Sequence, residues 1–220
     1  MQLNEIKPII HPKLYASLEA RHLLELRPSQ EKAIKAGLFE DKNLLVCTPT
    51  GSGKTLVAEL AALQAVYNQI GKAIYIVPLK ALASEKYKEF KQRYPDVKIA
   101  LSIGDVDAEE EYLAGYDIII TTSEKLDSLI RHSIPWLRFV KIVIIDEIHL
   151  LNDTGRGPTL EILITLLKHL LKKVQIIGLS ATIGNPEELA EWLDAELVMD
   201  TWRPVALKKG VFLDGKINFS

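Results

Sequence analysis

The stretch NLLVCTPTGSGKT, residues 43–55, decides the fold of this chain. An apolar run leads into a turn with two glycines, a lysine and hydroxyl residues, and an apolar helical pattern follows. One interpretation is a plain strand-to-helix turn, because Gly and Pro interrupt regular structure in general. The other is a phosphate-binding P-loop, with the pattern GxxxxGK[ST] between a strand and a helix. Thr48 stands where that pattern has its first glycine.

The P-loop interpretation assigns a chemical role to each part of the turn. Backbone N–H groups and the helix N-terminus would bind phosphate oxygens. Lys54 would reach the β- and γ-phosphates, and the Thr55 hydroxyl would hold Mg²⁺. Glycines allow the backbone angles and the close approach that a Cβ would block. The predicted nucleotide-binding residues of the loop are Thr48, Pro49, Thr50, Gly51, Ser52, Gly53, Lys54 and Thr55.

Short β-branched runs alternate with longer helical patterns along the chain. The predicted strands are 43–49, 72–78, 97–103, 116–122, 140–147 and 174–181, and the predicted helices are 54–70, 81–94, 123–132, 158–173 and 185–193. Ser123 is the expected N-cap of the helix at 123–132, and Asn185 is the expected N-cap of the helix at 185–193. Most strands are nearly continuous apolar runs, which is typical of strands covered on both faces. We therefore predict an α/β fold with a doubly wound, mostly parallel sheet and helices on both faces.

A second buried strand ends in acidic residues, in KIVIIDEIHLL at 141–151. Two ionised carboxylates there would be costly without a nearby cation, and P-loop chemistry needs a carboxylate for Mg²⁺. We assign Asp146 to Mg²⁺ and Glu147 to orienting or deprotonating the attacking water. The alternative, a strand that simply ends in polar residues, is disfavoured because GSGKT precedes it. His149 is either a structural histidine or a link between nucleotide and nucleic acid.

Composition excludes several classes of protein. The chain has 220 residues, a formal net charge of −2 and a single cysteine, so an internal disulfide is excluded. The charge favours no partner, since many nucleic-acid binders are strongly basic. No apolar run approaches the roughly 18 residues of a membrane span, and the N-terminus lacks signal-peptide features. We expect a soluble, cytoplasmic protein.

Three motifs in order resemble a known family. TPTGSGKT, DEIH and SAT are similar to motifs I, II and III of the superfamily 2 DExH helicases. LRPSQEKAI (26–34) resembles their Q motif, VPLKALASEKY (77–87) motif Ia, and TTSEKLDSL (121–129) motif Ib. GRGPTLEILI (155–164) and WRPVALKKGV (202–211) are similar to the Ski-type branch and, within it, to the archaeal Hjm-type DNA repair helicases.

This resemblance implies an ATP-dependent 3′–5′ DNA helicase, associated with replication forks or repair, that uses ATP and Mg²⁺ and binds single-stranded or forked DNA. Gln30 would read adenine, since an amide can pair with N6 and N7. The implied catalytic residues are Lys54, Asp146 and Glu147, and the implied coupling residues are His149, Ser180, Ala181 and Thr182. The implied nucleic-acid contacts are Lys80, Ala81, Gly104, Asp105, Thr122 and Ser123. Contacts of this kind to the backbone carry position but not sequence.

The resemblance also predicts the domain organisation. Residues 1–200 would form one RecA-like ATP-binding lobe, and 201–220 an extended linker towards a second lobe that supplies arginine fingers. The sequence has no GRxGR-like motif, and Arg156 matches a first-lobe element. A finger arginine is worth about 10³–10⁵ in rate, so we expect this lobe alone to be nearly inactive. Two alternatives stay open, an RNA helicase of the Ski type and a non-catalytic nucleotide-binding scaffold module.

Overall fold

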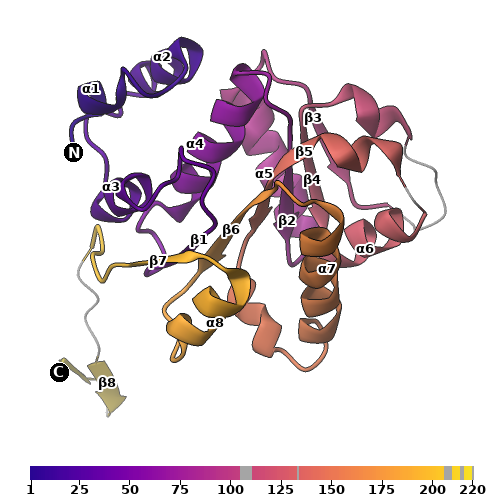
Figure 1. Cartoon of the computed structure of the whole chain (residues 1–220). Helices are drawn as coiled ribbons and strands as arrows, with labels where there is room; N and C mark the ends of the chain where they lie inside the picture. Colours follow the sequence, from indigo (N-terminus) through magenta and orange to yellow (C-terminus); the bar gives the residue numbers. More distant parts are fainter. Residues whose placement is uncertain (105–110, 133, 206–209, 214–215, 220) are drawn as a thin grey trace.

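The computed structural model describes residues 1–104, 111–132, 134–205, 210–213 and 216–219. A sheet of seven parallel strands runs through its centre, in the order β3-β4-β2-β5-β6-β1-β7 (Figure 1). The strands are β1 (Leu44–Cys47), β2 (Lys72–Val77), β3 (Ile99–Ser102), β4 (Ile118–Thr122), β5 (Val140–Ile145), β6 (Gln175–Ser180) and β7 (Glu196–Met199). The predicted doubly wound α/β fold is confirmed, and every strand pair of this sheet is parallel.

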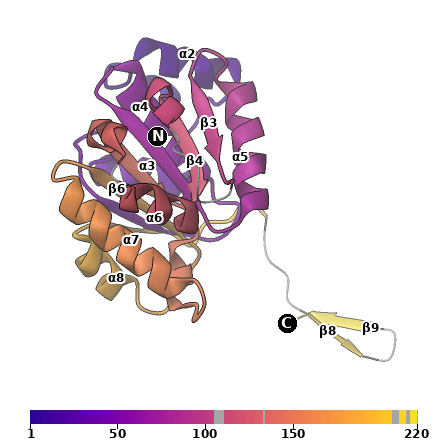
Figure 2. The same cartoon turned by 90° about the vertical axis from the view of Figure 1, so that its right-hand side faces the viewer.

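Helices cover both faces of the sheet (Figures 1 and 2). They are α1 (Leu3–Ile6), α2 (Pro12–Ala20), α3 (Pro28–Lys35), α4 (Lys54–Tyr67), α5 (Lys80–Arg93), α6 (Ser123–Arg131), α7 (Gly157–Leu170) and α8 (Pro186–Leu193). Buried residues of α1 to α5 form one hydrophobic core, and those of α6 to α8 form a second core. Along β1, Leu44 and Val46 enter the first core while Leu45 enters the second. Burial on both faces explains why these strands are continuous apolar runs.

Local chemistry sets where the helices begin. Gly53 precedes α4 with φ 96°, a left-handed conformation that an L side chain rarely adopts. The prediction that Ser123 caps α6 was wrong by one residue. Thr122 is the N-cap, its hydroxyl accepts a hydrogen bond from the Lys125 N–H at 3.4 Å, and Ser123 is the first helical residue. Asn185 precedes Pro186 at the start of α8, as the sequence predicts.

Several elements were not predicted from the sequence. They are helices α1, α2 and α3, the edge strand β7, the short 3-10 helices η2 (Pro135–Phe139) and η3 (Ile148–Asn152), and the antiparallel pair β8 (Gly210–Leu213) and β9 (Lys216–Phe219). The pair β8–β9 falls in the tail that the sequence predicts as an extended linker. The acidic stretch 105–115 is predicted from the sequence as a solvated loop with a short helix. The 3-10 helix η1 (Glu111–Gly115) lies in this stretch, and residues 105–110 lie outside the described residues.

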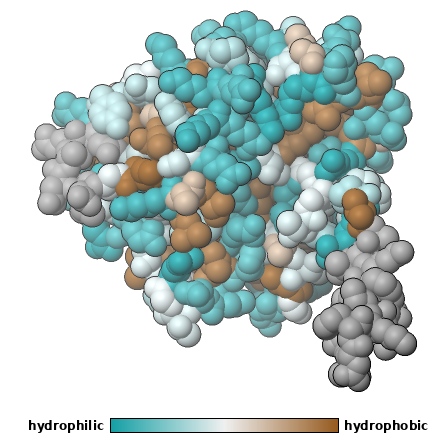
Figure 3. All heavy atoms as spheres, turned by 180° about the vertical axis from the view of Figure 1, so that it is seen from behind, coloured by the Kyte–Doolittle hydropathy of each residue, from teal (hydrophilic) through white to brown (hydrophobic). Residues whose placement is uncertain are grey.

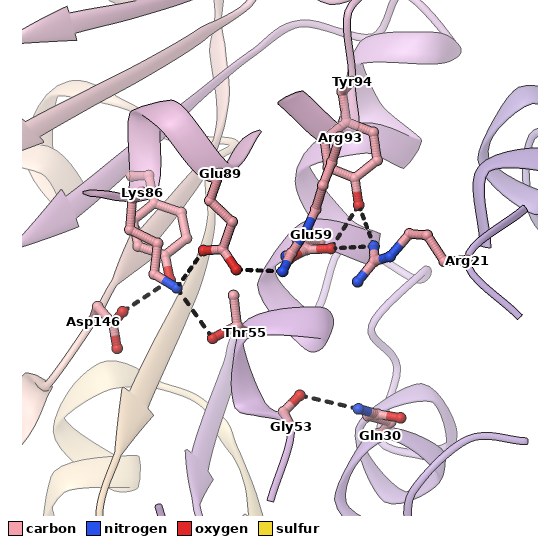
Figure 4. A network of polar contacts seen from close by, with 11 residues as sticks. Arg21, Gln30, Gly53, Thr55, Glu59, Lys86, Glu89, Arg93, Tyr94 and Asp146 are labelled. Atoms are coloured by element: carbon pink, nitrogen blue, oxygen red, sulfur yellow. Dashed lines mark hydrogen bonds and ion pairs between the residues drawn. The ribbon is translucent and has the colours of Figure 1, made fainter. Parts of the chain in front are cut away.

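A buried carboxylate links the N-terminal segment and the end of α5 to the P-loop helix α4 (Figure 4). Glu59 on α4 has only 1% of its side chain exposed. Its Oε2 accepts hydrogen bonds from Arg21 at 2.8 Å and from the Tyr94 hydroxyl at 2.6 Å, and its Oε1 accepts one from Arg93 at 2.6 Å. A buried charge must be paired in this way, because an unpaired one would be strongly destabilising. The P-loop helix is therefore linked to two segments far from it in sequence.

The surface is mixed in character. In the view from behind, hydrophilic residues cover most of the surface and hydrophobic residues form small separate patches (Figure 3). Scattered exposed apolar residues are normal for a folded domain. Within the described part of the chain, no helix combines the length and the apolar character needed to cross a membrane.

Candidate nucleotide and nucleic-acid site

Every motif that the sequence singles out as a strand-to-loop junction lies at the carboxyl edge of the sheet. The P-loop follows β1, Asp146 follows β5, and the segment 180–182 ends β6, which lies between those two strands. The residues predicted to contact nucleic acid follow β2, β3 and β4, which form the adjoining half of the sheet. Ligands of open α/β sheets bind at this edge. The strand order therefore places the predicted nucleotide-binding residues and the predicted nucleic-acid contacts on different halves of this edge.

The glycine-rich loop has the backbone that a phosphate cradle requires. Gly51 has φ 82° and Gly53 has φ 96°. A Cβ at Gly53 would lie 2.3 Å from the Nε2 of Gln30 and would displace that side chain, and the φ of 96° would strain any L residue there. Thr48 and Ser52 are buried, and their hydroxyls hydrogen bond to each other at 2.7 Å across the loop. Thr48 therefore fills the position of the missing first glycine while fastening the loop.

Lys54 points back into the loop in this structure. Its Nζ donates a hydrogen bond to the carbonyl oxygen of Thr48 at 2.8 Å. Burial lowers the pKa of Lys54, and the negative charges of Glu147 and Asp146 partly offset that effect. Lys54 thus lies in a half-buried position facing two carboxylates, where an anionic phosphate would stabilise its charge.

The two carboxylates after β5 are held differently. Asp146 Oδ2 accepts a hydrogen bond from the Tyr75 hydroxyl at 2.9 Å, and its Oδ1 accepts one from the Glu147 N–H at 3.0 Å. Glu147 has φ 53°, which is uncommon for a residue with a side chain. Such backbone strain clusters at functional sites. Asp146 is therefore held at both carboxylate oxygens, and Glu147 lies in the strained turn between β5 and η3.

One cavity of about 360 Å³ unites these groups. Its lining residues are Arg27, Thr50, Gly51, Gly53, Lys54, Thr55, Val77, Leu82, Glu85, Lys86, Asp146 and Glu147. The Thr55 hydroxyl and the Asp146 carboxylate supply hard oxygen donors, which suit Mg²⁺. The residues present thus fit the predicted metal and phosphates. A larger cavity, of about 660 Å³, lies at the opposite, amino edge of β1 and β6 and contains none of the predicted residues.

The predicted adenine-reading residue is buried beside the loop. Gln30 Nε2 donates a hydrogen bond to the Gly53 carbonyl oxygen at 3.1 Å, and Oε1 accepts one from the Arg27 N–H at 2.8 Å. Arg27 in turn donates to the Gly51 carbonyl oxygen at 2.7 Å, and its guanidinium lies 5.5 Å from the centre of the Trp202 ring. The start of α3 therefore braces the loop directly.

The predicted coupling residues line the same edge. Ser180 ends β6 opposite Cys47 of β1 and is fully buried. Its Oγ has no hydrogen-bond partner among the described residues. His149 Nδ1 lies 3.3 Å from Glu147 Oε2 but in poor hydrogen-bond geometry. Ala181 and Thr182 follow directly after the strand. Motif III therefore lies next to motif I, while His149 is adjacent to the carboxylate that it would sense.

The predicted nucleic-acid residues fall into two groups. Lys80 and Ala81 are exposed at the start of α5, and Gly104 is exposed after β3, where an added Cβ would meet no described atom within 4 Å. Thr122 and Ser123 are buried at the start of α6. Asp105 lies outside the described residues. The exposed group can reach a strand directly, whereas Thr122 and Ser123 position the start of α6.

Sequence reasoning missed Tyr75, which donates a hydrogen bond to Asp146 from outside the cavity, and several residues that line the cavity. Tyr75 interrupts an aliphatic strand, and this is the signal that could have marked it. Glu85 and Lys86 lie three and four residues after Leu82, a spacing that places both next to Leu82 on the helix surface. Arg27 gave no signal beyond its place within the stretch that resembles the Q motif.

Fold and site together define a class of protein. A parallel α/β sheet with a GSGKT loop after one strand, and paired carboxylates two strands away, is a RecA-like P-loop NTPase lobe. Residues 27–189 match the family model of the DEAD/DEAH box helicases, and the chain belongs to this family. The resemblance drawn from motifs I, II and III is thereby confirmed.

Curated relatives narrow the likeness further. The chain is 50% identical over 216 residues to the ATP-dependent DNA helicase Hel308 of Pyrococcus horikoshii. The aligned region covers 98% of this chain and 30% of that protein. The chain is 55% identical over 215 residues to the Hel308 of Methanocaldococcus jannaschii, of which it covers 18%. The crystal structure of the DUF1998 helicase MrfA bound to DNA is similar, with a TM-score of 0.73 and 28% identity over 87% of this chain and 30% of that chain. The chain thus spans less than a third of these relatives.

Proposed function

We propose that this chain is the first motor lobe of an ATP-dependent DNA helicase, and that it binds Mg²⁺–ATP at the carboxyl edge of its sheet. The observation that supports this most is the shared cavity of Lys54, Thr55, Asp146 and Glu147. Bound Mg²⁺ supplies charge neutralisation to the phosphates. Lys54 binds the phosphates, Asp146 and Thr55 hold the metal, and Glu147 orients or deprotonates water.

DNA is the proposed polymer, because the relatives are described as DNA helicases and the similar structure was determined with DNA. Lys80, Ala81 and Gly104 are the proposed exposed contacts, with Asp105, Thr122 and Ser123 beside them. His149 and the segment 180–182 would link the two halves of the sheet edge. The proposed unwinding polarity is 3′ to 5′. Residues 201–220 would lead to a second lobe that completes the ATP site.

The test is steady-state ATP turnover by the 220-residue chain, with and without single-stranded DNA. Nucleotide binding without turnover is the expected result, since the finger arginines would come from the second lobe. The variant Glu147→Gln serves as the control for contaminating ATPase. DNA-stimulated turnover that this variant abolishes would overturn the half-site proposal, because the chain would then contain a complete catalytic site.

A further inference from the structure

A helix outside motifs I and II contributes a cation to the nucleotide cavity. Helix α5 lines it with Leu82, Glu85 and Lys86. The side chain of Lys86 is 19% exposed, so it lies largely inside the protein. Its Nζ donates a hydrogen bond to the Thr55 hydroxyl oxygen at 3.4 Å. This is the hydroxyl proposed to bind Mg²⁺, and the ammonium therefore lies beside the metal position.

Besides Thr55, the Lys86 ammonium contacts a carboxylate on its own helix (Figure 4). Its Nζ also pairs with Glu89 Oε2 at 3.1 Å. Glu89 is paired in turn with Arg93, whose other nitrogen donates to the buried Glu59. The chain of contacts thus runs from Thr55 to the buried carboxylate cluster. Because Glu59 is itself on the P-loop helix, Lys86 is anchored to the element that carries Thr55.

Charge in the cavity makes this placement informative. Three carboxylates line the cavity, those of Glu85, Asp146 and Glu147, and three basic side chains, Arg27, Lys54 and Lys86, face them. Arg27 and Lys54 each donate a hydrogen bond to a carbonyl oxygen of the loop. An ammonium near the Thr55 hydroxyl balances these carboxylates. A divalent cation bound to the same hydroxyl would repel that ammonium, and the repulsion is stronger in a half-buried site than in water. Glu89 offers Lys86 a place to withdraw to.

We propose that Lys86 is a positioning residue for the metal: its ammonium holds the Thr55 hydroxyl until Mg²⁺ arrives with the nucleotide, and it then withdraws towards Glu89. This inference rests on the proposed function, because it requires Mg²⁺–nucleotide to bind in the cavity. Lys80 begins the same helix. A movement of Lys86 would therefore act on the helix that also carries a proposed nucleic-acid contact.

The test is binding of a fluorescent ADP analogue to the 220-residue chain during a titration with Mg²⁺. The Lys86→Met variant should reach half-maximal Mg²⁺-dependent binding of the analogue at an Mg²⁺ concentration about three- to tenfold lower than the wild type. The reason is that the variant lacks the positive charge next to the proposed metal position. Lys86→Arg, which keeps the charge, should retain the wild-type midpoint. Lys88→Met is the matched control, because Lys88 is exposed on the same helix and does not line the cavity.

The outcomes separate this inference from the proposed function. An unchanged or higher midpoint in Lys86→Met, with wild-type binding intact, overturns the role of Lys86 alone. A lower midpoint in Lys88→Met of the same size also overturns it, since the effect would then be a general one of charge. A wild-type chain whose binding is insensitive to Mg²⁺ overturns both proposals. Circular dichroism melting of each variant establishes that the fold is retained.

Discussion

Gln30 and Gly53 are joined by a hydrogen bond from the side-chain Nε2 to the backbone carbonyl oxygen, at 3.1 Å. The other end of the same amide accepts a hydrogen bond from the Arg27 N–H at 2.8 Å. The residue predicted to read adenine therefore also holds the loop predicted to bind phosphate. Base and phosphate recognition would meet in one side chain.

We expect Gln30→Ala to weaken nucleotide binding and to reduce the preference for ATP over GTP. The loop loses its brace, which costs about 1 kcal/mol for a typical hydrogen bond, and the base loses its reader. Competition between ATP and GTP for a fluorescent analogue measures both effects. Equal weakening for the two nucleotides would assign Gln30 to the loop and withdraw its role in base recognition. Gln92→Ala, at an exposed position of α5, is the control.

Replacing Lys54 tests the phosphate cradle. Lys54→Ala should weaken nucleotide binding by about 100-fold, because hydrogen bonds from a charged group to the phosphates are worth up to about 3 kcal/mol. Calorimetric titration with ATP measures the loss. The melting temperature should stay close to that of the wild type, since Lys54 donates only to one loop carbonyl. Nucleotide affinity equal to that of the wild type would contradict a cradle at this loop.

Tyr75 is expected to support the metal site through Asp146. It is fully buried, and burial together with the nearby Asp146 raises its pKa, so its hydroxyl remains a donor at neutral pH. Tyr75→Phe leaves Asp146 Oδ2 without this donor and should cost about 1–2 kcal/mol of unfolding free energy. The melting temperature should fall by about 2–4 °C per kcal/mol for a chain of this size.

The control for Tyr75 is Tyr67→Phe. The Tyr67 hydroxyl donates to Asp96 at 3.1 Å in an exposed position. Its loss should change the free energy of unfolding by less than about 0.5 kcal/mol. Mg²⁺-dependent nucleotide binding should weaken in Tyr75→Phe only. A Tyr75→Phe protein as stable as the wild type would show that the hydrogen bond to Asp146 has no net effect on stability.

Gly157 allows the segment after DEIH to fold back on itself. A Cβ at this position would lie 2.1 Å from the backbone oxygen of Leu151 in η3. We expect Gly157→Ala to lower the unfolding free energy by about 1–3 kcal/mol, because the backbone must move to accommodate the methyl group. Gly184→Ala is the matched control, since a Cβ there meets no atom within 4 Å. Equal melting temperatures for the two variants would contradict this reading of the contact.

The main features of the fold follow from short-range patterns in the sequence. Continuous apolar runs predict strands covered on both faces, and the helical patterns between them predict parallel crossovers. β7 was missed because it is a half-exposed edge strand without such a run. The N-terminal helices were missed because their anchor, the ion pair of Arg21 with Glu59, joins residues 38 positions apart.

By itself, the sequence determined the loop, the carboxylates and their order, because turn chemistry and residue type are local properties. Only the tertiary structure decided which side chains support them. That the Tyr75 hydroxyl reaches Asp146, and that Lys86 reaches Thr55, depends on strand order and on the rotation of α5 against the sheet. Those relationships are set by packing in the two cores, and packing joins residues that no short sequence pattern connects.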